Sequence, residues 1–248
     1  MATDLTAAQF MKRLEELRSE DEKRKFHRYF TFDDNESGDG DQFIGVRMGH
    51  VFDLAKEFIQ MTPSEIEKLL ESPIHEARAG GCSIMGKQAY SKKTPESRRK
   101  ELYDLYLRRH DRINDWDLVD LAAHKVVGSY LCEFNKPRDV LYQLARSKDT
   151  WERRSSIVAT FFFIARGDVA DAFAIAEILI DDDEDLVNKA TGWALRAVGT
   201  KDKKALQAFL GHHAATMPRI TLRNAIEHFS KEERDHYLGL KKSASLGA

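Results

Sequence analysis

The feature that most constrains this chain is a series of helix-start signals with no strand pattern between them. Thr62 precedes Pro63 and lies three residues before Glu65, which is typical of a capped helix N-terminus. The cap-then-proline signal recurs at Ser72-Pro73 and Thr94-Pro95, and Lys136-Pro137 indicates one more helix start. No segment shows the alternation of a half-buried strand bounded by turn residues. The sequence therefore predicts an all-α protein.

Apolar stripes predict further helices on both sides of these signals. Residues 4–31 fit two amphipathic helices, with Phe10, Leu14 and Leu17 on one stripe and Phe26, Tyr29 and Phe30 on the next. Residues 114–128 fit another helix, and either Asn114 or Asp115 is suited to its N-cap.

Similar short segments recur at a nearly constant spacing. The segments that begin at Arg154, Lys189 and Asn224 are 35 residues apart, and Trp116, Arg154 and Trp193 are 38 and 39 residues apart. A period of this length built from helix pairs is typical of HEAT-like solenoids. We therefore expect a HEAT-like α-solenoid of antiparallel helix pairs, with residues 1–240 forming one domain and 241–248 a disordered tail. Residues at equivalent repeat positions would converge on the concave face.

The net charge of −2 hides an uneven distribution. Residues 76–154 contain 17 Lys and Arg against 12 Asp and Glu, whereas the rest of the chain has 22 against 29. A basic middle with acidic flanks is compatible with a confined anionic partner. This pattern predicts that the concave cleft is basic.

Several classes of protein are not expected. No apolar run reaches the roughly 18 residues that a membrane span requires, and Met1–Asp4 lack the basic and apolar regions of a secretory signal. The two cysteines, Cys82 and Cys132, lie in apolar helical contexts and are expected to be reduced thiols. We expect a monomeric cytoplasmic protein with no membrane contact.

Two motifs resemble ligand loops but lack a required residue. The acidic segment 33–41 resembles the start of a calcium loop, but Ile44 stands where a bidentate glutamate is needed. Residues 81–87 nearly spell a phosphate-binding loop, but Gln88 follows where Ser or Thr is required and no strand precedes. The glycines there are better suited to close helix packing. The histidines, among them His212, His213, His228 and His236, lack ligand spacing, so neither a metal nor another cofactor is predicted.

The pair Trp116 and Asp120 can be interpreted as structural or as functional. Residues four apart share one face of a helix, so an indole and a carboxylate would lie one above the other. In the structural reading Trp116 anchors the core and Asp120 caps a neighbouring helix, because buried polar groups need partners. In the functional reading the two side chains line a site.

Several segments together resemble the bacterial DNA alkylation repair glycosylases of the AlkD type. They occur in the family's order between Phe43 and Tyr237, which covers most of the chain. The matching segments are Phe43-Ile44-Gly45-Val46-Arg47, Trp116-Asp117-Leu118-Val119-Asp120, Trp151-Glu152-Arg153-Arg154, Gly192-Trp193-Ala194-Leu195-Arg196, Pro218-Arg219 and Leu222-Arg223-Asn224-Ala225-Ile226.

The resemblance implies a monofunctional DNA glycosylase that needs no metal or nucleotide. Such enzymes release purines alkylated at N3 or N7 from duplex DNA by cutting the N-glycosidic bond, with the lesion held against the cleft from outside. Carried over by motif, the catalytic cleft would be lined by Trp116, Asp120, Arg154 and Trp193. This sequence departs from shorter family members in the acidic segment 33–41, which would repel phosphate.

Basic residues of the same segments are the expected DNA contacts. They are Arg47, Arg153, Lys189, Arg196, Arg219 and Arg223. The alternative is a non-catalytic HEAT-repeat scaffold that binds DNA or a protein, because repeat solenoids are mainly interaction modules.

Overall fold

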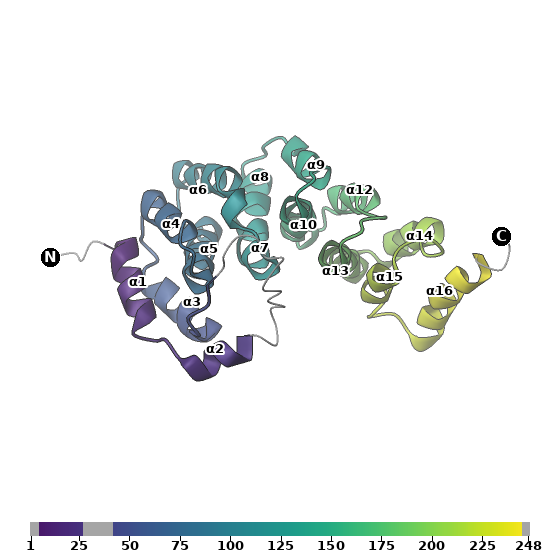
Figure 1. Cartoon of the computed structure of the whole chain (residues 1–248). Helices are drawn as coiled ribbons and strands as arrows, with labels where there is room; N and C mark the ends of the chain where they lie inside the picture. The colour runs from purple at the N-terminus through teal and green to yellow at the C-terminus, as the bar shows by residue number, and fades with distance from the viewer. Residues whose placement is uncertain (1–4, 27–41, 245–248) are drawn as a thin grey trace. The chain divides into compact units, whose positions relative to one another are not determined.

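Every regular element that the computed structural model describes, over residues 5–26 and 42–244, is a helix, which confirms the predicted all-α class (Figure 1). Within these residues a single isolated bridge, between Gln42 and Ile74, is the only β pairing. The acidic segment 33–41 and its rejected calcium reading lie outside the described residues.

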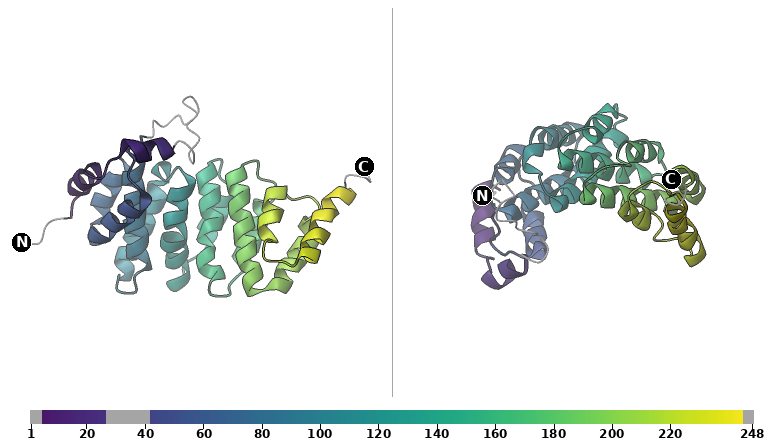
Figure 2. Two further views of the ribbon diagram at one scale, coloured as in Figure 1. Left: turned by 90° about the horizontal axis from the view of Figure 1, so that it is seen from below. Right: turned by 45° about the vertical axis from the view of Figure 1, so that its right-hand side comes forward.

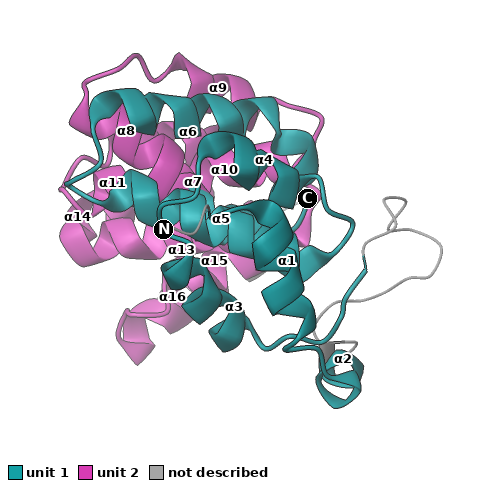
Figure 3. Ribbon diagram, turned by 90° about the vertical axis from the view of Figure 1, so that its left-hand side faces the viewer, with its two compact units in different colours: residues 1–122 teal, residues 123–248 magenta. Residues whose placement is uncertain are grey.

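The chain forms two compact units, Met1–Ala122 and Ala123–Ala248 (Figure 3). The sequence predicts one domain over residues 1–240. Stacked helix pairs contact mainly their neighbours, so their contacts fall into blocks along the chain. The boundary between the blocks lies near the end of α7 (Trp116–Ala123).

In the first unit the long helix α5 is buried along nearly its whole length, since α3, α4 and α6 pack against it. Helix α1 packs on α3 and α4. The helices before α7 are α1 (Ala7–Glu15), α2 (Glu20–Phe26), α3 (Met48–Glu57), α4 (Pro63–Leu70), α5 (His75–Tyr90), α6 (Glu96–Arg108) and the 3-10 turn His110–Arg112.

In the second unit the helices alternate between two layers (Figures 1 and 2). One layer holds α10, α13 and α15, packed in that order, and α9, α12 and α14 cover it. This layering of helix pairs is solenoid-like. The helices are α8 (Ser129–Glu133), α9 (Asp139–Ala145), α10 (Thr150–Ala159), α11 (Phe161–Ile164), α12 (Ala170–Ile178), α13 (Asp185–Lys201), α14 (Lys203–His213), α15 (Arg219–Ala225) and α16 (Lys231–Ala244).

The start signal at Thr62 and Pro63 is confirmed, although only half of the capping box that Thr62 and Glu65 suggest is formed. Helix α4 begins at Pro63, and the Thr62 side chain accepts a hydrogen bond from the backbone N–H of Glu65. The carboxylate of Glu65 does not complete the capping box, because it accepts from the N–H of Ala7 at 2.7 Å. The other proline signals precede α5, α6 and α9 by one or two residues.

The helix predicted over 114–128 begins two residues later, at Trp116, and changes from an α-helix to a π-helix after Ala123. The Asp115 carboxylate accepts from the N–H of Trp116 at 2.6 Å, where α7 begins. After Ala123 the chain continues as a π-helix, His124–Gly128. A Cβ on Gly128 would lie 2.2 Å from the carbonyl oxygen of Ala159, so this end of the π-helix packs too closely for any side chain.

Helices α5 and α16 and the lengths of the described helices bear on three smaller expectations. Residues 81–87 lie inside α5, and a Cβ on Gly81 would meet Leu69 at 3.3 Å, so this segment forms no loop and its glycine serves close packing. Helix α16 extends to Ala244, beyond the predicted start of the tail at residue 241, and residues 245–248 lie outside the described part. No helix among the described residues has the length and apolarity to cross a membrane.

Candidate functional site

The two candidate residues of the first unit, Trp116 and Asp120, lie on α7. Trp116 is the first residue of the helix and Asp120 follows one turn later, so both project from the same face. Each is half-buried. The Asp115 carboxylate accepts from the Trp116 N–H at the start of this helix, directly before the turn that carries the indole and the carboxylate.

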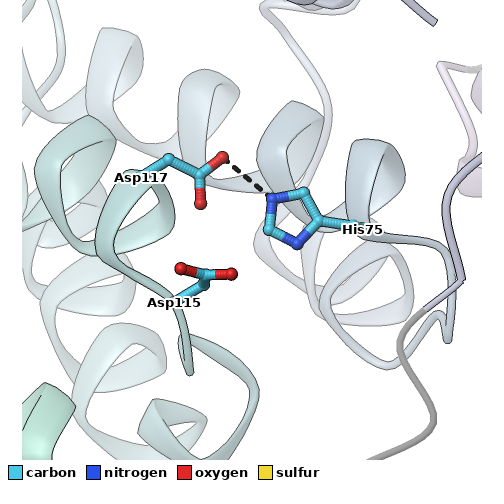
Figure 4. A group of neighbouring side chains, drawn as sticks. All are labelled: His75, Asp115 and Asp117. Carbon is cyan, nitrogen blue, oxygen red and sulfur yellow. Dashed lines mark hydrogen bonds and ion pairs between the residues drawn. The ribbon is translucent and has the colours of Figure 1, made fainter. Parts of the chain in front are cut away.

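A buried polar contact joins the first turn of α7 to the start of α5 (Figure 4). His75 Nε2 lies 2.8 Å from Asp117 Oδ2, and His75 is 0% exposed. On its other side, His75 Nδ1 lies 3.4 Å from Arg78 Nη2. A guanidinium can only donate, so Nδ1 accepts and Nε2 carries the proton that is donated to Asp117. The imidazole also stacks on Phe43, with 4.6 Å between the ring centroids.

Within the described part of the chain, one group has the geometry to hold a metal ion. His75, Asp115 and Asp117 each offer a ligand atom, and these atoms lie within 4.8 Å of one another. The hydrogen-bond pattern opposes coordination, because Nε2 carries a proton and Nδ1 faces the Arg78 cation. The arrangement favours a structural hydrogen-bond chain over a set of ligands.

The two candidate residues of the second unit contact each other. The guanidinium of Arg154, on α10, lies 5.5 Å from the centroid of a Trp193 ring, on α13. Arg154 is 1% exposed and donates through Nη1 to the carbonyl oxygen of Leu186. Trp193 Nε1 donates to Asn224 Oδ1 at 3.1 Å. Arg154 and Asn224 therefore fix the indole from two sides.

The structure thus places one pair of predicted site residues in each unit. Trp116 and Asp120 belong to the first unit, and Arg154 and Trp193 to the second. A single catalytic site built from all four residues, lining a basic cleft, stays a prediction.

Two of the cations predicted to bind DNA are held by the protein itself. Arg153 Nε lies 2.6 Å from Asp182, and the side chains are 16% and 5% exposed. The hydrogen bond to Asp182 raises the pKa of Arg153. Arg219 donates through Nη2 to the carbonyl oxygen of Leu238 at 3.0 Å. Both guanidinium groups connect separate segments of the second unit.

Among the described residues, none of the other four predicted cations connects two segments through a buried contact that the structure shows, and two of them, Arg47 and Arg223, are exposed. Arg47 forms an exposed pair with Glu22 at 2.6 Å, and its hydrogen bond is the main reason that the pKa of Glu22 falls to about 2. Arg196 pairs with Glu227. Lys189 is half-buried and Arg223 is exposed, and neither has an ion-pair partner among residues 5–26 and 42–244.

Sequence reasoning missed the role of Glu76, which organises the segment before α3. Its fully buried carboxylate accepts from the backbone N–H groups of Ile44, Gly45 and Val46, at 3.1, 2.8 and 3.2 Å. Gly45 has φ of +81°, and a Cβ there would lie 2.0 Å from Ser19 O. The Phe43–Val46 motif is therefore a backbone shape that wraps a carboxylate, and a glycine is required at its centre. The only signal in the sequence was an acidic residue at the start of a glycine-rich apolar helix.

Comparison with known proteins agrees with this fold. The family model described as DNA alkylation repair enzyme matches residues 10–229. A solved structure described as a predicted DNA alkylation repair enzyme from Enterococcus faecalis is similar, with a TM-score of 0.68 and 13% sequence identity. The similarity covers 86% of this chain and 97% of that one, and at this identity it shows the fold alone. No curated protein matches. Because the family model spans most of its length, the chain belongs to the DNA alkylation repair enzyme family.

Proposed function

We propose that this protein is a monofunctional DNA glycosylase that releases purines alkylated at N3 or N7 from duplex DNA. The observation that carries the proposal is the family match over residues 10–229, within which Trp116 and Asp120 share one face of α7. An indole and a carboxylate on one helix face are suited to a substrate that carries positive charge.

The chemistry requires little beyond electrostatic stabilisation. An N7-alkylguanine is cationic, so the bond from C1′ of the sugar to the base breaks with both electrons going to the base, which leaves neutral. The sugar becomes oxocarbenium-like, as in other glycosidic cleavages. Water then adds to C1′ and loses a proton. Asp120 would stabilise the developing cation and orient the water, an effect that often dominates catalysis.

The indoles would supply contact surface. The face of an indole is electron-rich, so it attracts a cationic base or sugar and packs against it. Trp193 is supported for this role because Arg154 lies over its ring and Asn224 accepts a hydrogen bond from its Nε1. Arg154 is almost completely buried, and we infer that it positions Trp193 instead of binding a phosphate.

The accessible cations are the best candidates for phosphate contacts. Within the part of the chain that the structure describes, Lys189 and Arg223 have no ion pair to break, and Arg47 and Arg196 would exchange a carboxylate for a phosphate. Arg153 and Arg219 are already bound within the second unit. A few such contacts, with no reading of base edges, suit an enzyme that must act at any sequence.

The direct test is release of the base from a duplex that contains a single 7-methylguanine, with EDTA present. Release well above the spontaneous rate, leaving an intact abasic strand, supports a metal-independent monofunctional glycosylase. Binding of the duplex with no acceleration supports the alternative, a DNA-binding scaffold. Release that requires an added divalent metal contradicts the proposed mechanism.

A further inference from the structure

We propose that His75 is a positioning residue for catalysis: through its hydrogen bond to Asp117 it fixes the first turn of α7, and with it Trp116 and Asp120. The inference rests on the proposed function, since it assigns a role to His75 in the same reaction. His75 itself would touch neither the DNA nor the reacting atoms.

The two hydrogen bonds of His75, with Arg78 and with Asp117, have a defined donor and acceptor. Arg78 is fully buried and can only donate, so it selects the form of His75 in which Nδ1 accepts. The proton is then on Nε2, which donates to Asp117 Oδ2 at 2.8 Å. The hydrogen bonds therefore run in one direction: the guanidinium donates to a neutral imidazole, and the imidazole donates to the carboxylate.

Within the described residues, the Asp117 carboxylate has one side-chain hydrogen-bond donor, His75. The Asp117 side chain is 13% exposed. The other oxygen, Oδ1, is buried and accepts no hydrogen bond in the same part of the chain. Loss of the imidazole N–H would leave a poorly solvated carboxylate without a donor, which is costly. Asp117 would then have to reorient.

Asp117 lies on the same short helix as the candidate catalytic side chains. Asp117 directly follows Trp116 and precedes Asp120 by three residues in the same eight-residue helix. His75 is a firm support because it is the first residue of α5 and its ring stacks on Phe43. A rotation of α7 that reoriented Asp117 would move Trp116 and Asp120 together. A misplacement of about 1 Å can cost about 10²-fold in rate.

The experiment compares His75→Phe with His75→Gln. Phenylalanine keeps a ring to stack on Phe43 but removes both hydrogen bonds, whereas the glutamine amide can both accept from Arg78 and donate to Asp117. His110→Phe, which alters another buried histidine packed edge-on against Tyr106, serves as the control for lost stability. Single-turnover release of 7-methylguanine is measured for each folded variant at saturating enzyme, together with its affinity for undamaged duplex and its Tm.

We expect His75→Phe to be about 10- to 100-fold slower, with duplex affinity within twofold, and His75→Gln to recover most of the rate. His110→Phe should lower Tm without this loss of rate. A folded His75→Phe that excises as fast as wild type overturns the inference, because His75 then serves stability alone. A wild type no faster than the spontaneous reaction overturns the proposed function itself and this inference with it.

A measurement on the wild type covers the case in which His75→Phe does not fold. Long-range ¹H–¹⁵N correlation spectra report which imidazole nitrogen of His75 carries the proton. Protonation of Nε2 alone at neutral pH is expected. A proton on Nδ1 would contradict the direction of the chain and overturn the inference.

Discussion

The guanidinium of Arg154 lies 5.5 Å from the centroid of a Trp193 ring and donates to the Leu186 carbonyl oxygen, with 1% of the residue exposed. Under the proposed function, a cation in this position would act on the substrate only through the indole that it contacts. Its charge is not presented to solvent, where phosphates would bind. Arg223, on α15, is exposed, so its charge does face solvent.

Arg154→Met and Arg223→Ala should therefore affect different measurements. Arg223→Ala should reduce the steepness of the log–log salt dependence of duplex binding by about 0.9 per lost phosphate contact, with little effect on folding. Arg154→Met should leave the salt dependence unchanged and lower the free energy of unfolding by about 1–3 kcal/mol, because Leu186 O loses its donor. Equal changes in salt dependence for the two variants would contradict the assignment.

Gly192→Ala should destabilise the second unit. The added Cβ would lie 2.6 Å from Asn224 Cβ and 2.7 Å from Thr221 O, so α13 and α15 would have to move apart. We expect a loss of about 1–3 kcal/mol from overpacking, measured by urea unfolding. Gly211→Ala on α14, where nothing lies within 4 Å, is the control and should be neutral or stabilising. A neutral Gly192→Ala would show that these helices are not this close.

Glu76→Gln should loosen the segment from Ile44 to Val46. All three backbone N–H groups donate to Oε1 of Glu76, and Ile44 N–H also donates to Oε2 at 3.3 Å; an amide removes the charge that strengthens these bonds and replaces one of the two acceptor oxygens with a donor. Hydrogen bonds to a charged group contribute roughly 1.5–3 kcal/mol each. Amide hydrogen exchange should become faster at residues 44–46 and stay unchanged in α4. Unchanged protection at Gly45 would be inconsistent with the carboxylate holding this turn.

Arg47→Ala should raise the pKa of Glu22, which is about 2 in the folded protein. The folded pKa lies below the ordinary value of 4.5, so the pair contributes stability above that value and loses it as the pH falls toward 2. Part of the shift should remain in the variant, because Lys25 also binds Glu22 at 2.6 Å. The measurement is a carbon NMR titration of the Glu22 carboxyl group. A pKa near 4.5 in the wild type would show that the pair does not form in solution.

The sequence predicted local features better than long-range ones. Thr62 caps α4, and the Asp115 carboxylate accepts from the first N–H of α7; both bonds reach N–H groups within three residues, so their signals are contained in a few adjacent letters. The expected repeat also rests on the periodicity of the chain, and the structure confirms its all-α, solenoid-like character while the HEAT-like assignment stays a prediction. The π-helix at 124–128 was missed because its apolar residues fit an α-helix equally well.

The sequence could not identify electrostatic partners that lie far apart along the chain. Arg153 carries the same charge as a phosphate-binding arginine, and only the fold brings it to Asp182, 29 residues away. His75 and Asp117 are 42 residues apart. The two pairs of candidate site residues followed from the family resemblance, and the structure adds what surrounds them.

The central claim is that Asp120 stabilises positive charge on the sugar. Asp120→Asn keeps the shape of the side chain and removes its charge, and the loss of one preorganised group typically costs about 10²–10³ in rate. Duplex binding should survive or tighten, because a carboxylate repels phosphate. Asp111→Asn, which removes an exposed carboxylate paired with Arg109, is the control and should keep the wild-type rate.

The decisive measurement is single-turnover release of 7-methylguanine by wild type and Asp120→Asn at equal duplex occupancy. We expect release by Asp120→Asn to be about 10²–10³-fold slower, with affinity for the duplex retained. Equal rates for the two proteins, both above the spontaneous reaction, would contradict it and leave Asp120 with a structural role.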